Sequence, residues 1–188
     1  MQVSVITLVA LIACGDTAPA PAPAPEPAAK VEEPAPEPVA AEEPAAEEPN
    51  VVTVEGDVAM VALEGTDQMK YNTKLIEVPA GKKVKLTLKH TGKLPAAAMG
   101  HNFVLLVPGT DGAAFATAAV KAKDTEYIPA AMAGQVIANT GIVGGADGDT
   151  KEVTIEFDAP DAGEYTFLCS FPGHYAMMNG VFKVVAEG

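Results

Sequence analysis

The pattern of hydrophobic and polar positions divides the chain into two unlike parts. From residue 51 onward, short runs of β-strand character alternate with turns rich in Gly, Pro, Asn and Asp. In residues 83–90, Val84, Leu86 and Leu88 alternate with polar residues. Such alternation predicts a strand with one buried and one solvated face.

Further runs of strand character complete the predicted set. They span residues 51–54, 74–78, 101–107, 135–139, 152–157, 165–169 and 181–185. Their turn residues recur at the spacing expected of an all-β sandwich. Residues 111–133 differ, because they are rich in Ala and lack alternation, so we expect one short helical flap outside the sandwich.

The first residues have the composition of an export signal. Residues 3–13 are apolar but too few to span a bilayer, which suits a secretory signal. They end in Leu-Ile-Ala-Cys, which resembles the bacterial lipoprotein signal, so we expect residues 1–13 to be a lipoprotein signal peptide and Cys14 the lipidation site. An ordinary signal peptide is the alternative, since Met1 and Gln2 provide no basic segment.

Residues 14–50 consist almost entirely of Ala, Pro and Glu and contain no aromatic residue. Pro favours an extended conformation of about 3.1 Å per residue, so the segment could reach on the order of 100 Å. We expect a disordered, lipid-anchored tether that holds the folded domain, residues 51–188, away from a membrane. A disordered tail without a spacing role is the alternative.

Charge narrows the range of partners. The chain of 188 residues has a net charge of −13, and its 12 basic residues are all Lys. Residues 15–50 hold nine acidic residues and one Lys, a net of −8, so −5 remains elsewhere. A basic cluster that could neutralise phosphates is missing, so we expect no nucleic-acid binding.

The candidate chemistry lies in residues 168–180. Cys169 ends a predicted strand, Pro172 and Gly173 predict a turn, and His174 follows. If Cys14 is acylated, Cys169 is the only thiol left, and a free Cys in an exported protein suggests metal binding. His101, at the start of another predicted strand, could supply a second imidazole.

Together with a thioether from Met177 or Met178, these groups form the ligand set of a blue-copper site that carries single electrons. Zinc could also take two nitrogens and one sulfur, although a thioether adds little for zinc. Each residue alone has a plainer explanation. Cys169 could be a small buried hydrophobe, His101 a core histidine, and the methionines core packing.

Five segments resemble the azurins of the cupredoxin family. They are Cys-Ser-Phe-Pro-Gly-His-x-x-x-Met at 169–178, Met-Gly-His-Asn at 99–102, Gly-Thr-Asp-Gln-Met at 65–69, His-Thr-Gly-Lys-Leu-Pro at 90–95 and Gln-Val-Ile-Ala-Asn-Thr at 135–140. The resemblance covers most of residues 56–186. It implies a Greek-key, cupredoxin-like β-sandwich.

The resemblance also implies roles for individual residues. The copper ligands would be His101, Cys169, His174 and axial Met178, with Met177 as the axial alternative and Gly100 as a weak backbone-carbonyl contact. Asn102 and the backbone N–H of Phe171 would hydrogen-bond around the Cys169 sulfur. His174 would be the partly exposed ligand through which electrons leave. An apolar patch for partners would comprise Met69, Met99, Phe171 and Pro172.

The chain departs from the azurin pattern at three points. The azurin disulfide is absent, Phe103 replaces the usual core Trp, and Asn139 replaces a surface His. None of these removes a copper ligand. His90 matches an azurin histidine that is not a ligand, and we expect it to be partly buried.

The resemblance predicts an electron carrier, not an enzyme, with one copper ion that cycles between Cu(I) and Cu(II). Its partners would be redox proteins such as cytochromes, membrane respiratory complexes or periplasmic reductases. We expect a monomer, exported as a lipoprotein and anchored facing the periplasm or on the cell surface, with the outer membrane favoured. A copper-handling protein, an enzyme and a metal-free adhesive sandwich are the alternatives.

Overall fold

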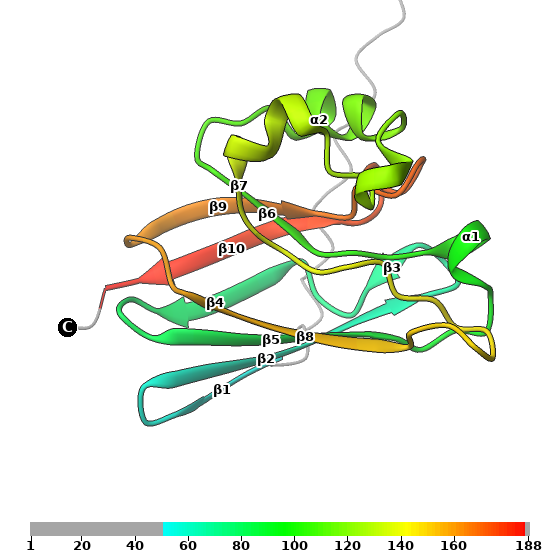
Figure 1. Ribbon diagram of the computed structural model, residues 1–188. Helices are drawn as coiled ribbons and strands as arrows, with labels where there is room; N and C mark the ends of the chain where they lie inside the picture. Colours follow the sequence, from blue (N-terminus) through cyan, green and yellow to red (C-terminus); the bar gives the residue numbers. More distant parts are fainter. Residues whose placement is uncertain (1–50, 187–188) are drawn as a thin grey trace, which may run out of the picture. The chain divides into compact units, whose positions relative to one another are not determined.

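Two facing β-sheets make up the part of the chain that the computed structural model describes, residues 51–186 (Figure 1). The first sheet contains β1 (Val52–Glu55), β2 (Val58–Thr66), β5 (Lys83–His90) and β8 (Glu152–Asp158), with β3 (Lys70–Tyr71) paired to β2. The second contains β4 (Leu75–Pro79), β10 (Asn179–Val185), β9 (Gly163–Leu168), β6 (Val104–Leu106) and β7 (Val136–Asn139). The predicted signal peptide, tether and lipidation site at Cys14 lie outside these residues.

Both sheets are mixed, because the chain crosses between them repeatedly. β2 and β5 are parallel, with Val61 opposite Leu86, and β4 and β10 are parallel, with Ile76 opposite Phe182. The other strand pairs are antiparallel. The predicted Greek-key β-sandwich is confirmed.

The core lies between the sheets and follows the alternation in the sequence. Val84, Leu86 and Leu88 of β5 are fully buried, while the three Lys residues of the strand, at 83, 85 and 89, are exposed. From the second sheet, Phe167 and Phe182 pack into the same core. Each such buried side chain contributes about 1.5–3 kcal/mol relative to an exposed one.

A second layer covers the outer face of the second sheet, where α2 (Gly112–Ala119) lies (Figure 1). Phe115 of α2 packs on Val104, Leu106 and Leu168. β6 is therefore buried on both faces, which explains its unbroken apolar run. The predicted helical flap is confirmed, although its α-helix ends at Ala119 and two 3-10 turns follow, η1 (Lys123–Thr125) and η2 (Ala130–Gln135).

Some boundaries differ from those predicted. The pattern missed β2, whose outward positions include Val58 and Met60, so that apolar residues occupy both faces and the alternation is weak. It also missed the two-residue β3 and the one-turn helix α1 (Ala96–Met99). His101 forms only an isolated bridge, with Val143, before β6 begins. Within residues 51–186, no helix has the length and apolar character needed to cross a bilayer.

Candidate metal centre

The loop from Cys169 to Met178 joins β9 to β10 and is closed at its base. The N–H of Cys169 donates to the carbonyl of Met178 at 2.9 Å. Inside the loop, the N–H of His174 donates to the carbonyl of Phe171 at 3.1 Å, and the N–H of Met178 donates to that of His174 at 2.8 Å. Gly173 has a φ of +83°, which other residues rarely adopt. The tight turn places His174 beside the start of the loop.

Three donor atoms converge at this loop. The Nδ1 atoms of His101 and His174 lie 3.2 Å apart, and Cys169 Sγ lies 3.7 Å from His174 Nδ1. All three side chains are buried, and their donor atoms lie within 4.8 Å of one another. Two imidazole nitrogens and one sulfur suit copper or zinc.

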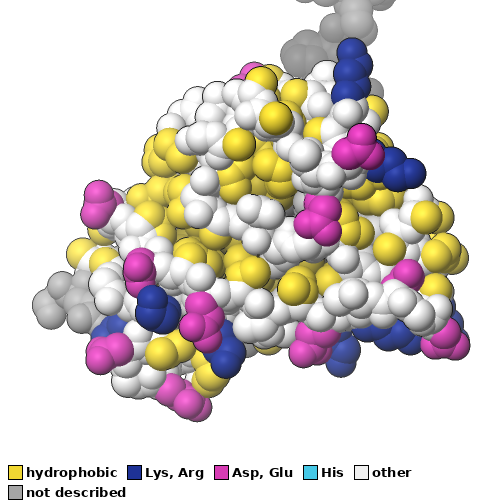
Figure 2. All heavy atoms as spheres, in the orientation of Figure 1, with side chains coloured by type: hydrophobic (Ala, Val, Ile, Leu, Met, Phe, Trp, Pro, Cys, Tyr) yellow, Lys and Arg dark blue, Asp and Glu magenta, His cyan; other side chains and the backbone are white. Residues whose placement is uncertain are grey.

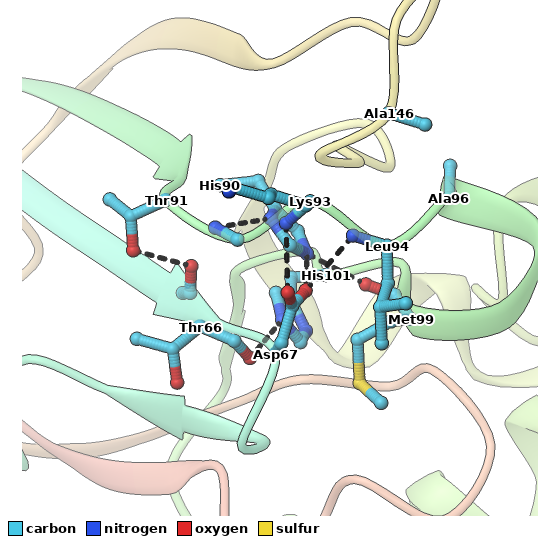
Figure 3. Close-up of polar contacts among 12 residues, drawn as sticks. Thr66, Asp67, His90, Thr91, Lys93, Leu94, Ala96, Met99, His101 and Ala146 are labelled. Atoms are coloured by element: carbon cyan, nitrogen blue, oxygen red, sulfur yellow. Dashed lines mark hydrogen bonds and ion pairs between the residues drawn. The ribbon is translucent and has the colours of Figure 1, made fainter.

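The orientation of His101 is fixed by β2. Its Nε2 lies 2.9 Å from the carbonyl of Thr66, so Nε2–H donates there and Nδ1 keeps a lone pair toward the other donors (Figure 3). Gly65 makes room for the ring, since a Cβ added there would lie 2.6 Å from His101 Cδ2. Two backbone hydrogen bonds with Val143 hold the residue from the other side.

His90 supports His101 from behind. The two rings stack with centroids 4.6 Å apart and planes 11° apart. Gly92 N–H donates to His90 Nδ1 at 3.0 Å, so the ring donates through Nε2 to the carbonyl of Met99 at 3.0 Å. His90 is only 2% exposed, so the expectation of partial burial was wrong. The His101 ring stacked on it contributes to this burial.

Asp67 ties the neighbouring loop to this pair of histidines. Its carboxylate accepts the N–H groups of Lys93 at 2.8 Å and Leu94 at 3.2 Å (Figure 3). One carboxylate oxygen lies 3.8 Å from His90 Nε2. The hydrogen bond from Lys93 lowers the pKa of Asp67, so the carboxylate stays charged and holds the loop in place.

Burial sets the protonation state of the three donors. It lowers the pKa of His101 and of His174 to about 4 and raises the pKa of Cys169 to about 11. At neutral pH the imidazoles are therefore uncharged, and the sulfur carries its proton. A cation that binds here must displace one proton, from the thiol.

Hydrogen bonds from two loops surround the sulfur. Burial raises the pKa of Cys169, and the nearby backbone N–H groups of Asn102 and Phe171 offset part of that rise. The Asn102 side chain accepts the N–H of Ser170 at 2.9 Å and donates to Ser170 Oγ at 2.9 Å and to the carbonyl of Glu126 at 3.2 Å. Asn102 thereby fixes the position of the Cys169 loop relative to the His101 segment.

The two methionines differ in burial. Met178 is 0% exposed and packs with Cys169 and Phe171, whereas Met177 is 46% exposed. Gly100, next to His101, is also buried and closely packed. A Cβ added to Gly100 would lie 2.5 Å from the carbonyl oxygen of Ala96.

The expected surface around His174 is less open than the resemblance implied. His174 is 3% exposed and is packed against the Phe171 ring, with centroids 4.7 Å apart, so its expected partial exposure was wrong in degree. Phe171 is 8% exposed. Met69, Met99 and Pro172 are partly exposed. On the face drawn in Figure 2, no histidine side chain is visible, and hydrophobic side chains spread over the upper and middle parts.

Sequence reasoning missed four residues at this centre. Three of them are described above: Gly65, which makes room for the His101 ring, Thr66, which accepts from it, and Ser170, which hydrogen-bonds with Asn102. The fourth is Tyr71, whose hydroxyl donates to the carbonyl of Asn102 at 2.5 Å. Gly65 and Thr66 stand in one of the azurin-like segments, which was the available signal. Tyr71 lies two residues beyond that segment, on a strand too short to show alternation.

Comparisons with known proteins agree on one family. The family model for copper binding proteins, plastocyanin/azurin family, matches residues 57–185. Azurin of Alcaligenes faecalis is 44% identical over 127 residues, which cover 66% of this chain and 96% of that protein. Outer membrane protein H.8 of Neisseria meningitidis serogroup B is 41% identical over 124 residues, or 65% of this chain and 66% of its own length. A solved azurin of Methylomonas sp. strain J matches with a TM-score of 0.58 and 30% identity, covering 67% of this chain and 97% of that one.

Proposed function

Because this chain belongs to the plastocyanin/azurin family of copper-binding proteins, we propose that His101 Nδ1, Cys169 Sγ and His174 Nδ1 hold its copper ion. The convergence of these three buried donors is the observation that carries the proposal. Met178 is the proposed axial ligand, because it is buried against Cys169 while Met177 faces solvent. Gly100, adjacent to His101, would supply a weak contact through its backbone carbonyl.

The protein is an electron carrier and not an enzyme, with one copper ion as its cofactor. The bound copper supplies a one-electron couple between Cu(II) and Cu(I). The chain supplies a site that suits both states, since imidazole serves either one and thiolate and thioether favour Cu(I). His101 is held by β2, and Asn102 ties its segment to the Cys169 loop. These contacts limit rearrangement when the charge changes.

Electrons would leave through His174, the histidine ligand on the loop between β9 and β10. It is the less buried of the two imidazoles at the centre. Met69, Met99, Phe171 and Pro172 would form the apolar contact surface around it. As a redox carrier the protein exchanges electrons with redox proteins; cytochromes, membrane respiratory complexes and periplasmic reductases are the proposed partners.

An exported, membrane-anchored location fits the N-terminal sequence. Residues 1–13 would direct export, Cys14 would carry the lipid, and residues 14–50 would tether the copper domain to the outer membrane. The similarity to a protein named outer membrane protein H.8 supports this location. The anchored chain would act as a monomer.

A copper titration of the full chain tests the proposed site. Added Cu(II) should produce an intense visible absorption from sulfur-to-copper charge transfer, bleached reversibly by one electron per copper. Cys169→Ser should abolish the absorption, while Cys14→Ala, which removes the other cysteine, should keep it. A colourless wild-type protein, or a blue Cys169→Ser variant, would contradict the proposal.

A further inference from the structure

Tyr71 places a phenol hydroxyl beside the proposed copper ligands. The residue lies on β3, and its ring packs on Phe167 with centroids 5.6 Å apart. The same side chain packs against the buried cluster of Cys169, Phe171 and Met178. Its hydroxyl is turned inward, because it donates to the carbonyl of Asn102 at 2.5 Å. The chain thus directs a polar group into an otherwise apolar cluster.

The ring and hydroxyl also lie against the cluster that contains the Cys169 sulfur. Burial raises the pKa of Tyr71 well above its usual value, and the nearby Cys169 raises it further. A phenol has one proton, and two acceptors compete for it here, the carbonyl oxygen of Asn102 and the sulfur. The sulfur is a weak acceptor as a thiol and a much stronger one as a thiolate. The hydroxyl proton is therefore drawn toward the sulfur when Cys169 is deprotonated.

We propose that the Tyr71 hydroxyl is a third hydrogen-bond donor to the Cys169 sulfur, beside the N–H groups of Asn102 and Phe171, and that it raises the reduction potential of the centre. The proposal rests on the function proposed above. A donor on the thiolate withdraws electron density from it, which stabilises the more electron-rich Cu(I) state relative to Cu(II). Tyr71 is a positioning residue, because it acts through Cys169.

Tyr71→Phe is the test, since it removes the hydroxyl and keeps the ring. Tyr165→Phe is the matched control: its hydroxyl also donates to a backbone carbonyl, that of Asp161 at 2.8 Å, but its ring belongs to the core between the sheets. The full copper-loaded chains are compared by reduction potential and by visible spectrum. Tyr71→Phe should stay blue, with a lower potential and a charge-transfer band at longer wavelength, while Tyr165→Phe should match the wild type.

An unchanged or higher potential in a blue Tyr71→Phe variant would overturn this inference and leave the proposed function standing. A wild-type chain that fails to turn blue would overturn the proposed function itself. A second measurement covers the case in which Tyr71→Phe does not fold. Replacing all tyrosines by 3-fluorotyrosine makes the phenol a stronger donor and should raise the potential of the wild-type chain. No rise would contradict the proposal.

Discussion

The Nδ1 atoms of His101 and His174 lie 3.2 Å apart, although 73 positions separate the two residues in the chain. The Nε2–H of His101 is used by Thr66, so His101 Nδ1 is an acceptor, and a neutral His174 donates to it in the metal-free protein. Burial keeps both rings uncharged. The fold therefore presents two imidazole nitrogens and a thiol at one point before any metal arrives.

Copper binding should release about one proton per ion at neutral pH. The proton comes from Cys169, whose pKa burial raises to about 11, while the histidines are already neutral. Titration of the metal-free protein with Cu(II) in a pH-stat measures the release. Cys169→Ser is the control and should release none; a wild-type release near zero would show that the thiol is not a ligand.

Stability of the metal-free protein should be greatest between about pH 6.5 and pH 9. The pKa of both His101 and His174 falls from 6.5 to about 4 on folding, so the unfolded chain binds more protons below pH 6.5. Each histidine then costs about 1.4 kcal/mol per pH unit as the pH drops toward 4. The pKa of Cys169 rises from 9.0 to about 11, so stability also falls as the pH rises above 9.

Urea unfolding at a series of pH values measures this profile. His174→Gln is the control, because it should remove roughly half of the histidine contribution to the slope below pH 6.5. An identical slope in the variant would show that His174 is not buried in its neutral form.

Replacing Met178 should change the reduction potential of the copper site, whereas replacing the adjacent Met177 should not. Met178→Leu conserves volume at a buried site and should cost less than about 1.5 kcal/mol in the free energy of unfolding. It should leave the protein blue but raise its reduction potential, because the axial thioether tunes that potential. Met177→Leu, at a half-exposed site, should change neither. If the effects are reversed, Met177 is the axial ligand.

Gly65→Ala should destabilise the protein and weaken copper binding. The new Cβ would lie 2.6 Å from His101 Cδ2, so either the ring or β2 must move. Overpacking of this kind costs about 1–3 kcal/mol. Thermal unfolding and competition with a copper chelator measure the two effects. Gly134→Ala, where the added Cβ meets no atom within 4 Å, is the control; equal behaviour of the two variants would show that the ring adapts freely.

Cys14→Ala should move the protein from the membrane fraction to the soluble fraction, because it removes the proposed lipid attachment. Cell fractionation with antibody detection measures the distribution. The soluble variant should still turn blue with copper, since Cys14 lies far along the chain from the proposed ligands. Continued membrane attachment would contradict lipidation at Cys14.

The sequence predicted strands that bury one face and expose the other, because their apolar and polar residues alternate. The β5 pattern predicted its buried residues, since one side of the strand meets the core and the other meets solvent. β2 was missed because apolar residues occupy both of its faces, and periodicity then carries no information. β3 was missed because two residues cannot show a period.

The sequence by itself determined which residue types could form the site, because the Cys169–Met178 segment holds a thiol, an imidazole and thioethers in one short loop. Only the tertiary structure decided how they meet: that β2 orients His101 through Thr66, that Met178 and not Met177 faces inward, and that the Tyr71 hydroxyl donates to the Asn102 carbonyl. These are contacts between segments far apart in the chain. Their distances follow from sheet packing, which no local pattern contains.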